Sequence, residues 1–95
     1  MPMKDPPHPG LLIKANFEEL GISIVDAANR LHMDPHQLEA ITNGEAPITA
    51  DVAIRLGLAF KHDNREFWLR LQAAYDLAQA EQSTGNLDIQ RFAVT

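Results

Sequence analysis

Four histidines offer the most reactive side chains of the sequence, since imidazole binds metal ions and exchanges protons near neutral pH. His32 and His36 are four residues apart, but Pro35 and a predicted turn lie between them, so they do not share a helix face. His8 and His62 have no candidate ligand nearby in the sequence. Because the chain also lacks cysteine and the HExxH pattern, we predict that it holds no metal ion.

Nucleophilic and phosphate-transfer chemistry has no support either. Ser23 and Ser83 lack the glycine elbow that exposes a catalytic serine. Asn43-Gly44-Glu45 is a turn rather than a phosphate-binding loop, since no GxxxxGK[ST] pattern is present. We therefore predict no catalytic residue, no cofactor and no enzyme activity.

Residues 23–44 carry the strongest pattern, and that pattern indicates binding. The segment SIVDAANRLHMDPHQLEAITNG contains two short helical stretches separated by a three- to four-residue turn. This is the layout of a helix-turn-helix, in which Leu31, Leu38 and Ile41 supply the shared core. The layout alone equally allows a compact helical bundle with no role in nucleic-acid binding.

Start and stop signals divide the chain into five predicted helices, so the predicted fold class is all-α. The first predicted helix covers residues 10–20, with Pro9 at its start and Gly21 after its end. The second is capped by Ser23, and the third begins at Asp34-Pro35 and stops at Asn43-Gly44. The fourth is capped by Thr49, and the fifth covers residues 65–82.

These helices form one predicted domain over residues 9–82. Residues 1–8, MPMKDPPH, are predicted to form an extended arm, because proline fixes its own φ and restrains the residue before it. Residues 83–95 form a tail, for which a short strand and a loose helical turn fit equally well. Each end of the chain either becomes ordered when it binds a basic partner or stays frayed.

The composition limits the class of protein. A length of 95 residues suits one domain, because a second core would need roughly 100 more residues. No apolar run approaches the roughly 18 residues of a membrane span, and the absence of cysteine fits a reducing cytoplasm, so we expect a cytoplasmic protein with no membrane contact. Eight Lys and Arg against 13 Asp and Glu give a net charge of −5. This charge disfavours nucleic acid and favours a basic protein partner.

The fifth predicted helix carries two apolar stripes on nearly opposite sides. One face contains Phe67, Trp68, Leu71, Ala74, Tyr75 and Ala78. The other contains Leu69, Ala73, Leu77 and Ala80. Two stripes imply two buried faces, and a domain this small has one core. We therefore predict that the second stripe is a dimer interface. The alternative is that the tail folds back over this stripe through Ile89 and Phe92.

Four sequence blocks occur in a characteristic order. They are His8-Pro9-Gly10, the helix-turn-helix ending in Asn43-Gly44, Ala46-Pro47-Ile48-Thr49, and Glu66-Phe67-Trp68-Leu69-Arg70-Leu71-Gln72-Ala73-Ala74-Tyr75-Asp76-Leu77. Over residues 8–81 the chain resembles the HigA family of antitoxins, within the lambda-repressor-like (XRE) helix-turn-helix class. The resemblance implies a five-helix domain that binds operator DNA as a dimer, represses its own operon and neutralises a small, basic, mRNA-cleaving toxin of the HigB type.

The resemblance also implies which residues meet DNA. Base contacts in this class come mainly from the first turns of the third helix, which here correspond to Pro35, His36, Gln37 and Ala40. Pro35 has no backbone donor and Ala40 offers only a methyl group, so His36 and Gln37 are the plausible readers. Ser23 and Asn43 are candidates for phosphate contacts, which need no cationic side chain.

The charge of the helix-turn-helix departs from what DNA binding favours. Over residues 23–49 four acids face one base, Arg30; the acids are Asp26, Asp34, Glu39 and Glu45. We therefore predict DNA affinity that is weak or confined to one operator. Two alternatives stay open: a stand-alone transcriptional regulator without a toxin, and a toxin-binding module that has lost DNA binding.

Overall fold

The computed structural model describes residues 6–93, which form five helices and no strand. The helices are α1 (Pro9–Leu20), α2 (Ile24–Leu31), α3 (Pro35–Thr42), α4 (Ala50–Ala59) and α5 (Arg65–Thr84). The predicted all-α, five-helix fold is confirmed. The helix predicted over residues 65–82 is two residues longer than expected, so the tail begins at Gly85. Most of the predicted arm, residues 1–5, lies outside the described residues.

The predicted capping residues explain where three helices begin. The Ser23 hydroxyl accepts from the amide of Asp26, and the Thr49 hydroxyl accepts from the amide of Val52. The Asp34 carboxylate accepts from the amide of His36, 2.8 Å away. Each cap gives a partner to one of the amides that the first turn of a helix leaves without one.

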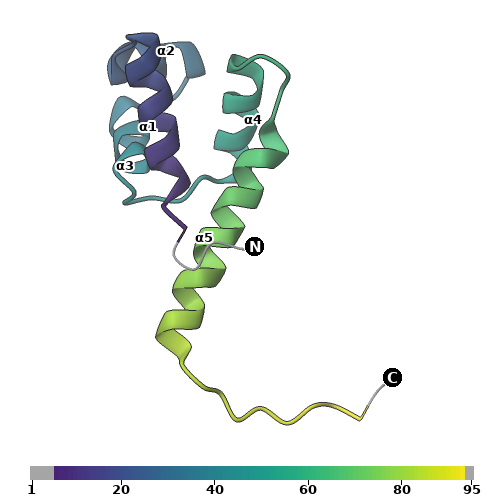
Figure 1. The fold of residues 1–95 in the computed structure, drawn as a ribbon. Helices are drawn as coiled ribbons and strands as arrows, with labels where there is room; N and C mark the ends of the chain where they lie inside the picture. The colour runs from purple at the N-terminus through teal and green to yellow at the C-terminus, as the bar shows by residue number, and fades with distance from the viewer. Residues whose placement is uncertain (1–5, 94–95) are drawn as a thin grey trace.

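Helices α1 to α4 and the start of α5 form a small head with one core (Figure 1). The helix-turn-helix supplies Leu31, Leu38 and Ile41 to this core, as predicted. Further buried side chains come from every other helix, and they include Ile13, Phe17, Val52, Leu56 and Trp68. The predicted helix-turn-helix is therefore an integral part of the packed head rather than an appendage.

Helices α1 and α3 cross so closely that only glycine fits at the contact. A Cβ on Gly10 would overlap the carbonyl oxygen of Ile41, which is a backbone atom. Gly10 is itself buried in the first turn of α1, and Ile41 is buried near the end of α3. This crossing fixes the position of α3 against α1.

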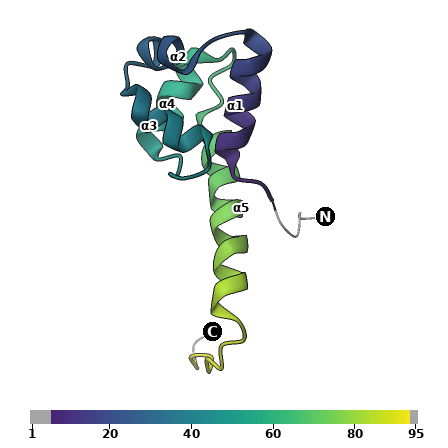
Figure 2. The same cartoon turned by 90° about the vertical axis from the view of Figure 1, so that its left-hand side faces the viewer.

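Helix α5 leaves the head and its C-terminal half stands free in both views (Figures 1 and 2). The radius of gyration, 16.2 Å, accordingly exceeds the about 12 Å of a compact chain of this length. Within α5 only Trp68 and Gln72 are buried. The Trp68 indole donates to the Asn64 side chain, and the Gln72 amide accepts from the amide of Ile48 at 2.8 Å.

Two details of α5 and the tail differ from the sequence-based expectation. Phe67 was expected on the covered face but is 44% exposed, and its ring meets that of the buried Trp68 edge-on. The tail from residue 85 to 93 is neither strand nor helical turn. It does not fold back over the stripe either, since Ile89 is 74% and Phe92 is 87% exposed.

None of the helices within residues 6–93 combines the length and the hydropathy that a bilayer crossing requires.

Candidate nucleic-acid interface

The first turn of α3 presents the two predicted base readers to solvent. His36 and Gln37 are exposed, whereas Leu38, the next residue, is buried in the core. Pro35 and Ala40 are half-buried beside them. The arrangement has the geometry that a reading helix needs, because one face is held by the domain and the first turn is free.

The two predicted phosphate contacts line one groove. Ser23 at the start of α2 and Asn43 at the end of α3 both border it, together with Lys14 of α1. The Ser23 oxygen already accepts from Asp26, but its hydroxyl hydrogen is free to donate to an anion. Lys14 is exposed and forms no ion pair within residues 6–93.

Lys14 was not assigned to this surface from the sequence. Its neighbour Ile13 marks the buried face of α1, so the sequence shows only that Lys14 lies next to that face. The groove arises from the crossing of α1 with α3, which depends on the Gly10 contact. Lys61 lies in the loop between α4 and α5 and does not line this groove.

The acidic excess of the helix-turn-helix persists in three dimensions. Glu18 and Glu39 line the groove with Lys14. Arg30 forms an exposed ion pair with Asp26, with 3.4 Å between nitrogen and oxygen, so its charge is partly compensated. Among residues 6–93, the groove therefore offers hydrogen-bond donors and one cation without an ion pair, Lys14, rather than a basic patch.

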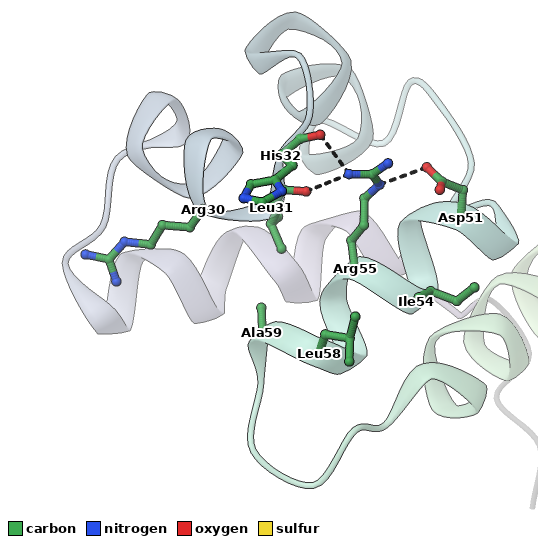
Figure 3. Close-up of a pocket in the computed structure, with 8 residues that line it drawn as sticks. All are labelled: Arg30, Leu31, His32, Asp51, Ile54, Arg55, Leu58 and Ala59. Carbon is green, nitrogen blue, oxygen red and sulfur yellow. Dashed lines mark hydrogen bonds and ion pairs between the residues drawn. The ribbon is translucent and has the colours of Figure 1, made fainter.

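The turn between α2 and α3 is held by a residue that sequence reasoning missed. His32 ends α2 in the left-handed conformation, with φ 57° and ψ 47°. Arg55 of α4 reaches this turn (Figure 3) and its Nη1 donates to the carbonyls of Leu31 and His32 at 2.9 and 2.7 Å. Its Nε donates to Asp51 at 3.0 Å. The spacing of Asp51 and Arg55 indicates only an exposed helical ion pair. The sequence therefore gives no sign that Arg55 also ties α4 to the turn after α2, a connection that we call the Arg55 tether.

His8 is a buried polar side chain at the junction between the arm and α1. His8 was placed in the extended arm, and its backbone is extended, but its side chain is buried and caps α1. Its Nδ1 accepts from the amide of Gly10 at 2.9 Å, and its ring meets Tyr75 edge-on at 4.9 Å between centroids. The structured domain therefore begins before residue 9. Burial lowers the pKa of His8, while the charge of Asp76 and a hydrogen bond to the backbone of Ala46 oppose this shift.

Acidification is expected to destabilise the protein through His8. The folded state favours the neutral ring, so its pKa lies below the ordinary value of 6.5. The stabilising contribution is complete above that ordinary value and is lost as the pH falls from it through the folded-state pKa. Urea unfolding at about pH 7.5 and about pH 5.5 measures this loss.

The matched variant for this measurement is His8→Asn. Asparagine keeps a capping oxygen for α1 but does not titrate. We expect a smaller loss of unfolding free energy on acidification in H8N than in the parent chain. Equal losses in both proteins would show that other groups cause the pH dependence.

Comparison with known proteins defines the family. No protein-family model matches the chain. The virulence-associated protein A' of Dichelobacter nodosus is 51% identical over 77 residues, which are 81% of this chain and 67% of that protein. The structure of an addiction module antidote protein of the HigA family from Coxiella burnetii is similar at 38% identity and TM-score 0.80, covering 85% of this chain and 88% of that chain. The chain belongs to the HigA family of helix-turn-helix antitoxins.

A second HigA structure includes DNA. The Pseudomonas aeruginosa antitoxin HigA with the higBA promoter is 34% identical, with TM-score 0.79, and the match covers 84% of this chain and 87% of that one. The resemblance noted in the sequence is thereby confirmed. In this HigA-family chain, no group of three His, Cys, Asp or Glu side chains within residues 6–93 is arranged to hold a metal ion.

Proposed function

We propose that this protein is a type II antitoxin that binds operator DNA as a dimer and neutralises a HigB-like toxin. The observation that carries the proposal is the likeness, at TM-score 0.79, to a HigA antitoxin whose structure includes its promoter. The exposed first turn of α3 supports the same conclusion, because His36 and Gln37 are free to enter a major groove. The protein would act by binding rather than as an enzyme.

DNA contacts divide into two sets in this proposal. Gln37 can pair bidentately with adenine and His36 can hydrogen-bond a base edge, while the Ala40 methyl group and the ring of Pro35 make apolar contacts. Ser23 and Asn43, with Lys14 beside them, hold phosphates along the groove. Because a single cation without an ion pair supports these contacts, we expect weak binding to unrelated DNA and clearly tighter binding to the operator.

A dimer would use the exposed second stripe of α5. Leu69, Ala73, Leu77 and Ala80 are all exposed on this helix. Leu77 is 62% exposed and belongs to the C-terminal half of α5, the half that stands free of the head (Figure 2). A two-fold pair of heads matches the symmetry of an operator with two half-sites.

The proposed toxin partner is a small basic protein. A net charge of −5 suits a basic protein. The tail carries exposed Leu87, Ile89 and Phe92, which gives it apolar side chains to bury against such a partner. A small basic open reading frame beside this gene would favour the antitoxin over the stand-alone regulator, and binding to that protein without promoter binding would favour the protein-only module.

Promoter binding tests the DNA half of the proposal. We expect the full chain to bind its own promoter duplex more tightly than a scrambled duplex. The slope of log affinity against log salt should be shallower than about −5, since fewer than about six phosphates are contacted. A steeper slope would contradict the sparse electrostatic surface described above.

The reading residues are tested in the same assay with His36→Ala and Gln37→Ala. Each change should lower promoter affinity about 5- to 150-fold, which is the range for losing one good base contact, and leave scrambled-duplex affinity unchanged. Gln90→Ala, in the tail, is the matched control and should bind like the parent. An unchanged promoter affinity in both α3 variants would show that the first turn of α3 does not contact the bases.

A further inference from the structure

Arg55 ties α4 to the connection between the two helices of the helix-turn-helix. One nitrogen of its guanidinium donates to two successive carbonyls, those of Leu31 and His32 (Figure 3). A second nitrogen is held by Asp51, one helical turn earlier on α4. The side chain is 34% exposed, so its charge is only partly screened by water. Three hydrogen bonds thus fix one side chain between two elements.

The carbonyls that Arg55 binds are those that a helix end leaves without partners. Leu31 is the last residue of α2, and His32 is its C-cap. A cation at this place also interacts favourably with the helix dipole. His32 has a positive φ, which is uncommon for a residue with a side chain, and the hydrogen bonds from Arg55 add to the support that this turn receives from its own backbone.

The direction in which the chain leaves His32 determines where α3 begins. Only Met33 and Asp34 separate His32 from Pro35, the first residue of α3. The amide of Met33 donates back to Ala28, and Asp34 caps α3. This short path leaves little freedom, so holding the His32 carbonyl also holds the start of α3 in place.

We propose that Arg55 is a positioning residue for operator recognition, which holds the first turn of α3 at the angle at which His36 and Gln37 reach the bases. This inference rests on the proposed DNA binding. In this proposal Arg55 acts through the turn: its Nε is engaged by Asp51 and its Nη1 by the two carbonyls, and the salt titration below tests whether Nη2 contacts a phosphate instead.

The first test uses no DNA. Amide hydrogen exchange is measured by NMR on the full chain, comparing Arg55→Gln with Arg70→Gln. Arg70 is the matched control, since it is an exposed arginine in an i,i+4 pair with Glu66 on α5. We expect exchange at the Met33 and His36 amides to rise about tenfold in R55Q and to stay unchanged in R70Q. Unchanged exchange in R55Q would overturn the tether.

The second test uses the promoter and scrambled duplexes. In R55Q the promoter affinity should fall about tenfold, the scrambled-duplex affinity should hold, and the salt slope should not change. A slope shallower by about one unit would identify Arg55 as a phosphate ligand and overturn the proposal. Unchanged promoter affinity with a lower melting temperature would assign Arg55 to stability alone and also overturn it.

Arg55→Lys keeps the inference testable if R55Q does not fold. Lysine retains the charge but lacks the planar fork that reaches Asp51 and both carbonyls, so R55K should bind the promoter more weakly than the parent chain. Parent-like affinity in R55K would overturn the geometric role. If the parent chain shows no promoter preference, the proposed function fails, whereas the exchange measurement still decides the tether.

Discussion

Replacing Gly10 with alanine is expected to destabilise the folded head strongly. The added methyl group would overlap the carbonyl oxygen of Ile41, and a backbone atom of a buried helix cannot move aside as a flexible side chain can. The overlap lies between α1 and α3, at the centre of the head. We expect a loss of more than about 3 kcal/mol in the free energy of unfolding, from the 5–15 kcal/mol or so typical of a domain. Thermal melting followed by circular dichroism measures the loss.

Gly21→Ala and Gly85→Ala are the matched controls for this change. Both glycines have positive φ, and nothing lies within 4 Å of a Cβ built on either of them. Alanine there costs only the conformational penalty, about 1 kcal/mol. If G10A melts within a few degrees of these controls, α1 and α3 do not cross as closely as described.

Replacing Leu77 with aspartate is expected to convert dimers into monomers. Leu77 lies on the free half of α5, in the stripe with Leu69, Ala73 and Ala80. In a symmetric interface the change buries two uncompensated carboxylates, each at a cost of several kcal/mol. We therefore expect the dimer dissociation constant to rise at least about 100-fold. Sedimentation equilibrium over a range of concentrations measures it, and the helical content should not change.

Phe92→Asp serves as the control for the interface. It introduces the same charge at an even more exposed apolar residue, in the tail rather than on the helix. A dimer in F92D and monomers in L77D would place the interface on α5. Dimers in both variants would refute that assignment, and monomers in F92D alone would move the interface to the tail.

Local chemistry explains why the helices were predictable. Ser23, Asp34 and Thr49 start helices because their side-chain oxygens satisfy amides only two or three residues away. Gly21 stops α1 because it adopts the left-handed conformation without a steric penalty. Contacts of such short range depend only on residues close together in the sequence, so they can be predicted without knowledge of the fold.

The parts that could not be predicted depend on contacts between distant residues. Arg55 meets carbonyls 23 and 24 residues earlier in the chain. Lys14 joins the candidate DNA surface only because α1 crosses α3. Phe67 has the spacing of a core residue but is 44% exposed, although Trp68, the next residue, is buried in the head. Periodicity shows which faces are apolar and does not show how much of each face the neighbouring helices cover.

The attachment of α5 has a mechanical consequence. Its two buried side chains, Trp68 and Gln72, are one helical turn apart, and each is also held by a hydrogen bond, to Asn64 and to Ile48 respectively. The helix is 20 residues long, so it forms a rod of about 30 Å clamped at one end. These two contacts set the direction in which α5 leaves the head. A small change in packing at Trp68 or Gln72 would displace the C-terminal end of α5 by several times as much, while the helix itself stayed intact.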